Sequence, residues 1–262
     1  MYDLKWVPFV VLFNREIQRF FKVSIQTVAS PLIASALYLL IFGVSLGKNI
    51  DLGVQMPYLA FLIPGLVMMG CLNNAFANSS SSVVGSKYAG ELEDYKVSPL
   101  SPNQILWALC FGGLFRGLLV SGITFLVGEA FYYVQMGEWL SVAHPVFLLF
   151  FLSVGGLSFA AFGMSVAFWA KSFDHMGAVG SFILQPLIYL GGVFYSVNNL
   201  PEFWQVISKF NPMLYLINGV RFGILGISDV SLGMSIFMSL AMLVVFYLVA
   251  FLILKNTNYK RW

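Results

Sequence analysis

Six stretches of the chain are at least twenty residues long and almost free of charged side chains, and they limit the possible folds more than any other feature. They cover about residues 27–47, 57–79, 105–134, 144–170, 176–197 and 232–254. Each can cross a hydrocarbon core about 30 Å thick as a helix rising 1.5 Å per residue. Lipid offers no hydrogen-bond partner to a backbone, so a crossing segment must be helical. The sequence therefore predicts an all-α integral membrane protein, with six transmembrane helices in a single domain spanning residues 1–262.

The composition excludes an ordinary soluble protein. Hydrophobic residues make up 59% of the chain and charged residues only 10%, whereas soluble domains carry about a quarter charged residues. So few polar side chains cannot cover a water-facing surface. The apolar runs are also about twice as long as the roughly ten-residue strands of a membrane β-barrel. Cys71 and Cys110 both lie inside apolar runs, where we expect them to act as small hydrophobic side chains.

Lysine and arginine residues are distributed unequally between the two sides of the predicted membrane domain. Ten lie on the side of the termini, three lie on the opposite side, and Arg116 lies within the third run. The ten are Lys5, Arg15, Arg19, Lys22, Lys87, Lys96, Lys171, Lys255, Lys260 and Arg261, and the three are Lys48, Lys209 and Arg221. Because cytoplasmic loops carry the excess of positive charge, both termini are predicted to be cytoplasmic. We expect membrane lipids as partners, and no nucleic acid.

Residues 4–22 precede the first run and carry a helical stripe of apolar side chains. The stripe consists of Trp6, Val10, Phe13, Ile17 and Phe20, at steps of four, three, four and three residues. The charged side chains of Arg15, Glu16, Arg19 and Lys22 are expected to lie mostly away from it. An amphipathic segment of this kind lies flat in the membrane interface. Two interpretations remain open, a simple anchor and a helix that also contacts a cytoplasmic partner.

The connection between the second and third runs, residues 80–104, is the largest predicted cytoplasmic loop. It carries three acidic residues within four positions, Glu91, Glu93 and Asp94, and Pro99 follows them. Acidic groups beside a membrane do not contribute to attachment to anionic lipid, but they suit docking onto another protein. The alternative is a loop that is merely solvated.

The segment between the fifth and sixth runs, residues 198–226, reads as two short helices separated by Asn211 and Pro212. Each is too short to span a bilayer, but both suit re-entrant or interfacial helices. The two short helices are interpreted as an outer gate over a pathway. Proline bounds the first helix, aromatic residues form its apolar face, and the second helix carries a cation. The gate residues are Pro201, Phe203, Phe210, Pro212, Tyr215 and Arg221.

Five polar residues lie inside the predicted spans, where polar groups are costly and therefore suggest function. Arg116 and Glu129 share the third span but are about 20 Å apart, too far to pair directly. Glu129 lies near the outer end, whereas Arg116 lies deeper and needs a partner. Asn73, Asn74 and Asn78 cluster in the second span, where hydrogen bonding between helices is favoured over contact with cargo.

No catalytic, metal-binding or nucleotide-binding motif is present in the sequence. His144 and His175 are assigned to opposite sides of the membrane, which argues against a shared metal site. Gly47 and Lys48 do not belong to a phosphate-binding loop, because Asn49 follows them and no glycine lies five residues before Gly47. We therefore expect no cofactor or metal in this chain, and any ATP and Mg²⁺ must bind to a separate ATPase chain.

With these features assembled, the chain resembles the ABC-2 type transporter permeases over essentially its full length. The most specific part runs from Leu184 to Arg221. Its matching residues are Leu184, Leu187, Leu190, Gly191 and Val193, then Leu200-Pro201, and finally Pro212-Met213-Leu214-Tyr215 and Arg221. The segment GELEDYKVSPLSP is similar to the loop that carries the family's coupling helix. Bacterial export permeases of the lipooligosaccharide, nodulation-factor and drug-export type are the most similar in these respects, which implies a location in a bacterial plasma (inner) membrane.

The resemblance implies a two-copy permease, in which each copy docks on a separate cytoplasmic ATP-binding subunit and the pair exports an amphiphilic cargo. It implies that residues 4–22 form an interfacial connecting helix, residues 86–100 a coupling element and residues 198–226 the outer gate. A secondary cytoplasmic contact would include Lys171 and Asp174. Cargo would pass along an interface built from spans one, two and five.

Two other classes of protein fit the sequence less well. A secondary transporter or channel is disfavoured because Glu129 is the only acidic residue within the spans, whereas proton-coupled transporters often carry several. An intramembrane enzyme is disfavoured because no paired acid and nucleophile lie at one depth of the membrane. The sequence therefore predicts a transport subunit that is not itself an enzyme.

Overall fold

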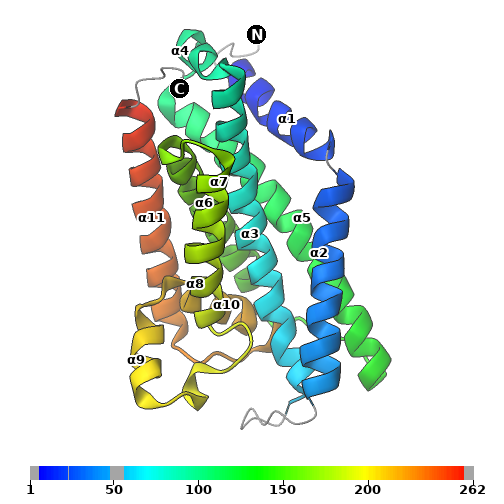
Figure 1. Cartoon of the computed structure of the whole chain (residues 1–262). Helices are drawn as coiled ribbons and strands as arrows, with labels where there is room; N and C mark the ends of the chain where they lie inside the picture. The colour runs from blue at the N-terminus through cyan, green and yellow to red at the C-terminus, as the bar shows by residue number, and fades with distance from the viewer. Residues whose placement is uncertain (1–5, 23, 48–55, 257–262) are drawn as a thin grey trace.

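The computed structural model describes residues 6–22, 24–47 and 56–256 and is helical throughout, apart from short connections (Figure 1). The elements are α1 (Val7–Lys22), α2 (Ser24–Tyr38), η1 (Leu39–Leu46), α3 (Tyr58–Ala89), η3 (Glu91–Glu93), α4 (Asp94–Val97), α5 (Pro102–Met136), α6 (Pro145–Trp169), α7 (Phe173–Val179), η4 (Gly180–Leu184), α8 (Gln185–Leu190), η5 (Val197–Asn199), α9 (Glu202–Phe210), α10 (Pro212–Leu225) and α11 (Leu232–Asn256). The all-helical class predicted from the sequence is confirmed for these residues.

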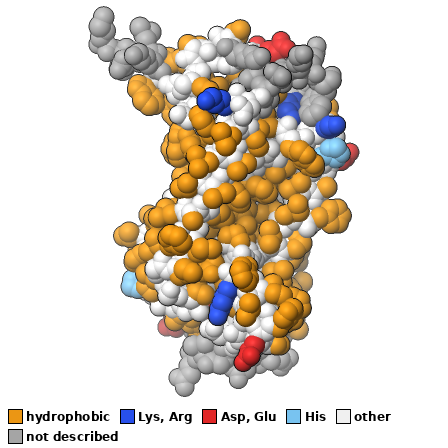
Figure 2. Space-filling model, turned by 90° about the vertical axis from the view of Figure 1, so that its left-hand side faces the viewer, with side chains coloured by type: hydrophobic (Ala, Val, Ile, Leu, Met, Phe, Trp, Pro, Cys, Tyr) orange, Lys and Arg blue, Asp and Glu red, His pale blue; other side chains and the backbone are white. Residues whose placement is uncertain are grey.

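Five helices of the described chain are long and apolar enough to cross a membrane. They are Val28–Leu46, in which α2 continues into η1, together with α3, α5, α6 and α11. These coincide with five of the six apolar runs of the sequence. Figure 2 shows one flank of the molecule as a broad hydrophobic band, with charged side chains gathered toward its two ends. Such a band suits contact with the hydrocarbon core of a bilayer.

The remaining apolar run, expected to be helical over residues 176–197, folds differently. Helical structure starts at Phe173, passes through α7, η4 and α8, and stops at Leu190. Gly192 then adopts a φ of +85°, in the left-handed region that favours glycine. The expected helix therefore ends at Leu190 rather than at residue 197, because the glycine pair Gly191-Gly192 turns the chain.

The second apolar run also has a different end from the one expected. Helix α3 continues to Ala89, and Gly90 ends it with a φ of +75°. Residues 80–89, expected as the first part of a loop, are therefore helical. Ser80 and Ser81 remain compatible with a helix because their hydroxyls donate back to carbonyls of the preceding turn, to Phe76 at 2.7 Å and to Asn78 at 3.1 Å.

Helix α3 is the centre of the molecule and packs against α5, α6 and α10 (Figure 1). Of its most apolar segment, 78% is buried, compared with 17% for the corresponding segments of α2 and α11. Close packing depends on glycine, because a Cβ on Gly163 of α6 would lie 2.6 Å from the carbonyl oxygen of Phe76 on α3. Helices α3, α5 and α6 thus form a tight core, and α2 and α11 lie at its edges.

Candidate functional site

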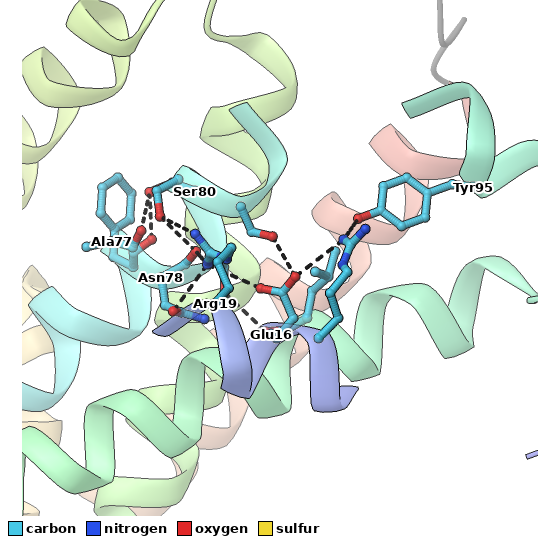
Figure 3. Close-up of polar contacts among 12 residues, drawn as sticks. Glu16, Arg19, Ala77, Asn78, Ser80 and Tyr95 are labelled. Carbon is cyan, nitrogen blue, oxygen red and sulfur yellow. Dashed lines mark hydrogen bonds and ion pairs between the residues drawn. The ribbon is translucent and has the colours of Figure 1, made fainter. Parts of the chain in front are cut away.

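Helix α1 carries a carboxylate that is completely buried against the helical core, that of Glu16. Figure 3 shows the polar contacts around it. The hydroxyl of Ser82 on α3 donates to Glu16 Oε1 at 2.7 Å. The guanidinium groups of Arg15 and Arg19 donate to the two carboxylate oxygens at 3.4 and 3.2 Å. A buried charge is tolerated when it is paired and hydrogen-bonded in this way.

The placement of Glu16 corrects the sequence-based interpretation of α1. The buried face of this helix runs through Leu12, Glu16 and Phe20, whereas Trp6 and Val10 of the predicted apolar stripe are exposed. Glu16 fits there because it packs over a glycine of α5. A Cβ added to Gly112 would lie 2.8 Å from the Cβ of Glu16, so only a bare backbone allows α1 to approach α5 this closely.

Arg19 connects α1 to the backbone of α3. Its Nη2 atom donates to the carbonyl oxygen of Asn78 at 2.7 Å and to the side-chain oxygen of Asn78 at 3.2 Å. Its Nη1 atom donates to the hydroxyl of Ser81 at 3.1 Å. Asn78, predicted only as an intramembrane polar residue, is thus fully buried at a contact between two helices.

Arg15 connects α1 to the inner turn, which we define as residues 90–98, between α3 and α5. Its Nη2 atom donates to the hydroxyl of Tyr95 on α4, and its guanidinium also lies 5.5 Å from the centre of the Tyr95 ring. Burial raises the pKa of Tyr95, so the phenol stays neutral and accepts this hydrogen bond. We call the linked side chains the inner polar cluster. Its members are Arg15, Glu16, Arg19, Asn78, Ser82 and Tyr95.

The three acidic residues of the inner turn lie at the surface beside this cluster, and Glu91 lines a pocket together with Arg15 and Arg19. Glu91, Glu93 and Asp94 are exposed, whereas Leu92 and Tyr95 are buried among them. Pro99, which follows the turn, is also exposed. The predicted docking acids therefore lie on the exposed surface of the inner turn. The buried side chains of Leu92 and Tyr95 hold this turn against the rest of the protein.

A second connection at this end of the molecule involves Lys87, near the end of α3. Its ammonium group donates to the carbonyl oxygens of Ala167, Phe168 and Ala170 at 2.6, 2.7 and 3.2 Å. Carbonyls at the end of a helix lack intrahelical partners and favour a cation, so Lys87 caps α6. Sequence analysis counted Lys87 only as a positive charge on the inner side.

The predicted secondary contact follows directly after this cap. Lys171 and Asp174 are both exposed, in the connection from α6 to α7 and in the first turn of α7. Phe173 stacks on Tyr88 at the end of α3, with ring centres 5.1 Å apart. The segment that carries Lys171 and Asp174 is therefore packed against the end of α3, directly before the inner turn.

Arg221 is fully buried on α10, near the opposite end of the molecule. Its Nη2 atom donates to the carbonyl oxygen of Gly192 at 2.7 Å, and its Nη1 atom lies 3.7 Å from a carboxylate oxygen of Asp229. Its guanidinium also lies 3.8 Å from the ring centre of Phe61 on α3. Protein groups therefore surround Arg221. Sequence analysis missed Asp229, although it is the acidic residue that follows Arg221 most closely in the chain.

The other predicted gate residues lie around α9. Pro201 and Pro212 flank this helix. Phe203 and Phe210 are 69% and 82% exposed, so they face away from the protein. Tyr215 is buried, and its hydroxyl donates to the carbonyl oxygen of Lys209 at 2.8 Å.

Of the remaining intramembrane polar residues, Asn73, Asn74 and Arg116 line one cavity, whereas Glu129 does not. The side chain of Gln185 on α8 donates to that of Asn73 at 3.2 Å, while Asn74 donates to the Gly70 carbonyl of its own helix at 3.0 Å. Glu129 accepts a hydrogen bond from the backbone of Leu140 at 3.1 Å. Arg116 lines a cavity between α2, α3 and α5. Among the described residues, no group of three or more His, Cys, Asp or Glu side chains is placed to hold a metal ion.

The sequence of the chain matches a known class of membrane transport proteins. The chain matches the family model described as ABC-2 type transporter over residues 8–225. The chain therefore belongs to the ABC-2 type transporter family, which confirms the resemblance seen in the sequence.

Individual relatives agree with this assignment. The chain is 36% identical to the inner membrane transport permease YadH of Escherichia coli (strain K12) over 256 residues, which are 98% of each chain. It is 24% identical to nodulation protein J of Rhizobium leguminosarum bv. trifolii over 222 residues, which are 84% of this chain and 80% of that protein. Nodulation protein J of Rhizobium meliloti (strain 1021) is 23% identical over 233 residues, 87% of this chain and 85% of that protein.

Proposed function

We propose that the chain is the membrane-spanning permease subunit of an ATP-driven exporter. Two copies form the translocation pathway, and each copy docks a separate ATP-binding subunit that holds ATP and Mg²⁺. Family membership and the permease name of the YadH relative support this proposal. The sequence has no phosphate-binding loop of its own, so the energy has to enter through a protein contact.

The proposal includes a membrane topology with six crossings and cytoplasmic termini. The segment from Phe173 to Leu190 supplies the crossing that is additional to the five long helices. Helix α1 lies in the cytoplasmic interface, while α9 and α10 form short outer helices that do not cross. The distribution of Lys and Arg supports this orientation. The inner membrane is the proposed location, as the name of the YadH relative indicates for that protein.

The observation that carries the proposal is the construction of the inner turn. Its acids Glu91, Glu93 and Asp94 are exposed to a partner, whereas Tyr95 is hydrogen-bonded to Arg15 of α1. From Arg15 the contacts continue through the buried carboxylate of Glu16 to α3. A force applied to the exposed acids is therefore passed to two helices at once. A rocking motion of helices between two states requires such a rigid connection between the docking surface and the helices that move.

The contact at Lys171 and Asp174 acts as a second, smaller docking point beside the inner turn. It is supported by the cap that Lys87 places on the end of α6, which ties this contact to α3. Two docking points on one rigid unit transmit rotation as well as displacement. The cargo is an amphiphile, by similarity to the export permeases named above, and it passes along the interface between two copies.

Reconstitution of the permease with its ATPase tests this function. A candidate ATP-binding partner chain is co-expressed with the permease, and the mass and ATPase activity of the purified assembly are measured. We expect two permeases and two ATPases per assembly, with no ATP hydrolysis by the permease alone. Hydrolysis by the purified permease, or an active permease that never binds an ATPase, would contradict the proposal.

A further inference from the structure

A cavity of about 280 Å³ lies between α2, α3 and α5, in the part of the molecule where these helices are apolar. Its lining includes the apolar side chains of Leu66 and Met69. It also includes the polar side chains of Asn74, Thr124 and Arg116. Arg116 is fourteen residues into α5, or about 21 Å along the helix axis from its start. The cavity therefore combines a cation and an apolar wall at membrane depth.

Arg116 has no counter-ion among the described residues. No acidic side chain lines the cavity, and the ion pairs of the described chain involve Arg15, Arg19 and Arg221 instead. Its Nε atom is buried without a hydrogen-bond partner. A charge that lacks a partner at this depth is costly, so the site is incomplete without an anion.

The protein near Arg116 increases this requirement for an anion. Arg19 acts on Arg116 through space as a like charge. The carboxylate of Glu16 does not neutralise Arg116 as well, because it already pairs with Arg15 and Arg19. The neutralising group therefore has to come from outside the described chain.

We propose that this cavity binds the anionic head group of an amphiphile, a phosphate or a carboxylate, with Arg116 as its ion-pair partner. Asn74 and Thr124 offer hydrogen bonds to the head group, and Leu66 and Met69 contact the first carbons of its chain. The inference rests on the proposed export function, because it names the class of cargo. It also assigns a recognition site to helices α2, α3 and α5 of one copy of the permease.

The dimensions of the cavity favour a head group attached to a tail. A volume of about 280 Å³ leaves room for a head group and the first carbons of its chain. The tail can leave past α2, whose side chains at Leu32, Ile33 and Leu37 are exposed and would lie against lipid or a second copy.

Binding of a short-chain anionic lipid to the purified full-length permease tests the inference. The probe is dioctanoyl phosphatidic acid, and its two comparison ligands are dioctanoylglycerol, which has the same tails without charge, and inorganic phosphate. Affinities are measured in detergent micelles by titration calorimetry. We expect the phosphatidic acid to bind about tenfold more tightly than either comparison ligand, because an ion pair formed out of water adds to the apolar contact.

Three variants distinguish this site from unspecific lipid binding. Arg116→Gln should weaken phosphatidic acid binding about tenfold, to the level of dioctanoylglycerol. Met69→Trp keeps the charge but fills the cavity, and it should also abolish the preference for phosphatidic acid. Lys255→Gln removes an exposed positive charge at the end of α11 and should leave all three affinities unchanged.

Several results would overturn the inference. One is wild-type affinity for phosphatidic acid in Arg116→Gln or in Met69→Trp, when the variant is monodisperse and has a wild-type melting temperature. Another is inorganic phosphate binding as tightly as phosphatidic acid, which would make the cavity a site for a free anion. The measurement needs no ATPase. If it fails while the permease still assembles with its ATPase, the head-group site is rejected and the proposed export function stands.

Discussion

At the scale of single residues, two buried charged side chains lie at opposite ends of the molecule, and each is bonded to at least one group outside its own helix. Glu16 holds α1 to α3 through Ser82 at the inner end. Arg221 holds α10 to the turn at Gly192 at the outer end. Removal of one partner from such a pair leaves the other buried and unpaired, which is more costly than the net contribution of the pair itself.

Replacement of Glu16 by alanine should loosen the inner polar cluster. The hydroxyl of Ser82 would lose its acceptor, and Arg15 and Arg19 would face each other without a carboxylate. We expect a loss of about 1–3 kcal/mol in the free energy of unfolding and reduced export. Thermal unfolding of the purified permease measures the first effect. Glu202→Ala, which removes an exposed carboxylate in α9, is the control, and equal stability of the two variants would contradict the assignment.

Arg221 and Asp229 should be energetically coupled. Arg221→Leu leaves the Gly192 carbonyl and the Asp229 carboxylate without their cation, and we expect a loss of about 3–5 kcal/mol in stability together with impaired export and intact ATPase binding. The double variant Arg221→Leu/Asp229→Asn should lose less than the sum of the single changes. A double-mutant cycle on thermal stability measures this coupling. Additive effects would show that the two side chains do not act as a pair.

At the scale of helices, the apolar runs predicted the five helices that are long and apolar enough to cross a membrane. Length and absence of charge can be read from the sequence of each helix alone. The inner polar cluster could not be predicted in the same way. Glu16 is buried because Gly112 of another helix leaves room for it, and no spacing within α1 records that contact. The end of α8 was misplaced for a similar reason, since apolar residues continue past the glycine pair that turns the chain.

Gly163, at the contact of α3 and α6, provides a test of how these two helices pack. In Gly163→Ala the new Cβ would lie 2.6 Å from the carbonyl oxygen of Phe76, and a backbone atom cannot move aside cheaply. We expect lower thermal stability and lower yield in the membrane. The matched control is Gly122→Ala in α5, where a Cβ meets no atom within 4 Å; alanine there should be neutral, or stabilising by up to about 1 kcal/mol. Equal behaviour of the two variants would be inconsistent with this packing.

At the scale of the whole molecule, the tight core is flanked by two helices whose apolar faces are largely uncovered, α2 and α11. Helix α2 lies next to α8, since the hydroxyls of Tyr38 and Tyr189 are 3.2 Å apart. This places α2 within the group of helices proposed to line the interface between copies, whereas α11 packs mainly on α6. We therefore expect a second copy on the α2 side and lipid against α11.

Cross-linking from single cysteines tests this assignment. Leu37 on α2 is 52% exposed and Leu248 on α11 is 50% exposed, so the two positions are matched in accessibility. Leu37→Cys should give a covalent dimer in membranes treated with a short bifunctional thiol reagent, and Leu248→Cys should remain monomeric. Background should be low because Cys71 and Cys110 are both buried. A dimer formed only from Leu248→Cys would place the interface on the other side of the molecule.

The central claim is that the energy for transport enters at the inner turn, and the Glu91→Ala/Glu93→Ala variant tests it most directly. ATPase co-purification and cargo export are measured at matched expression, beside Glu138→Ala, which removes an exposed carboxylate in the connection between α5 and α6. The account predicts that the double variant inserts normally but loses ATPase association and export, because the lost interfacial pairs cost about 2–5 kcal/mol. Wild-type association and export in the double variant would contradict the claim.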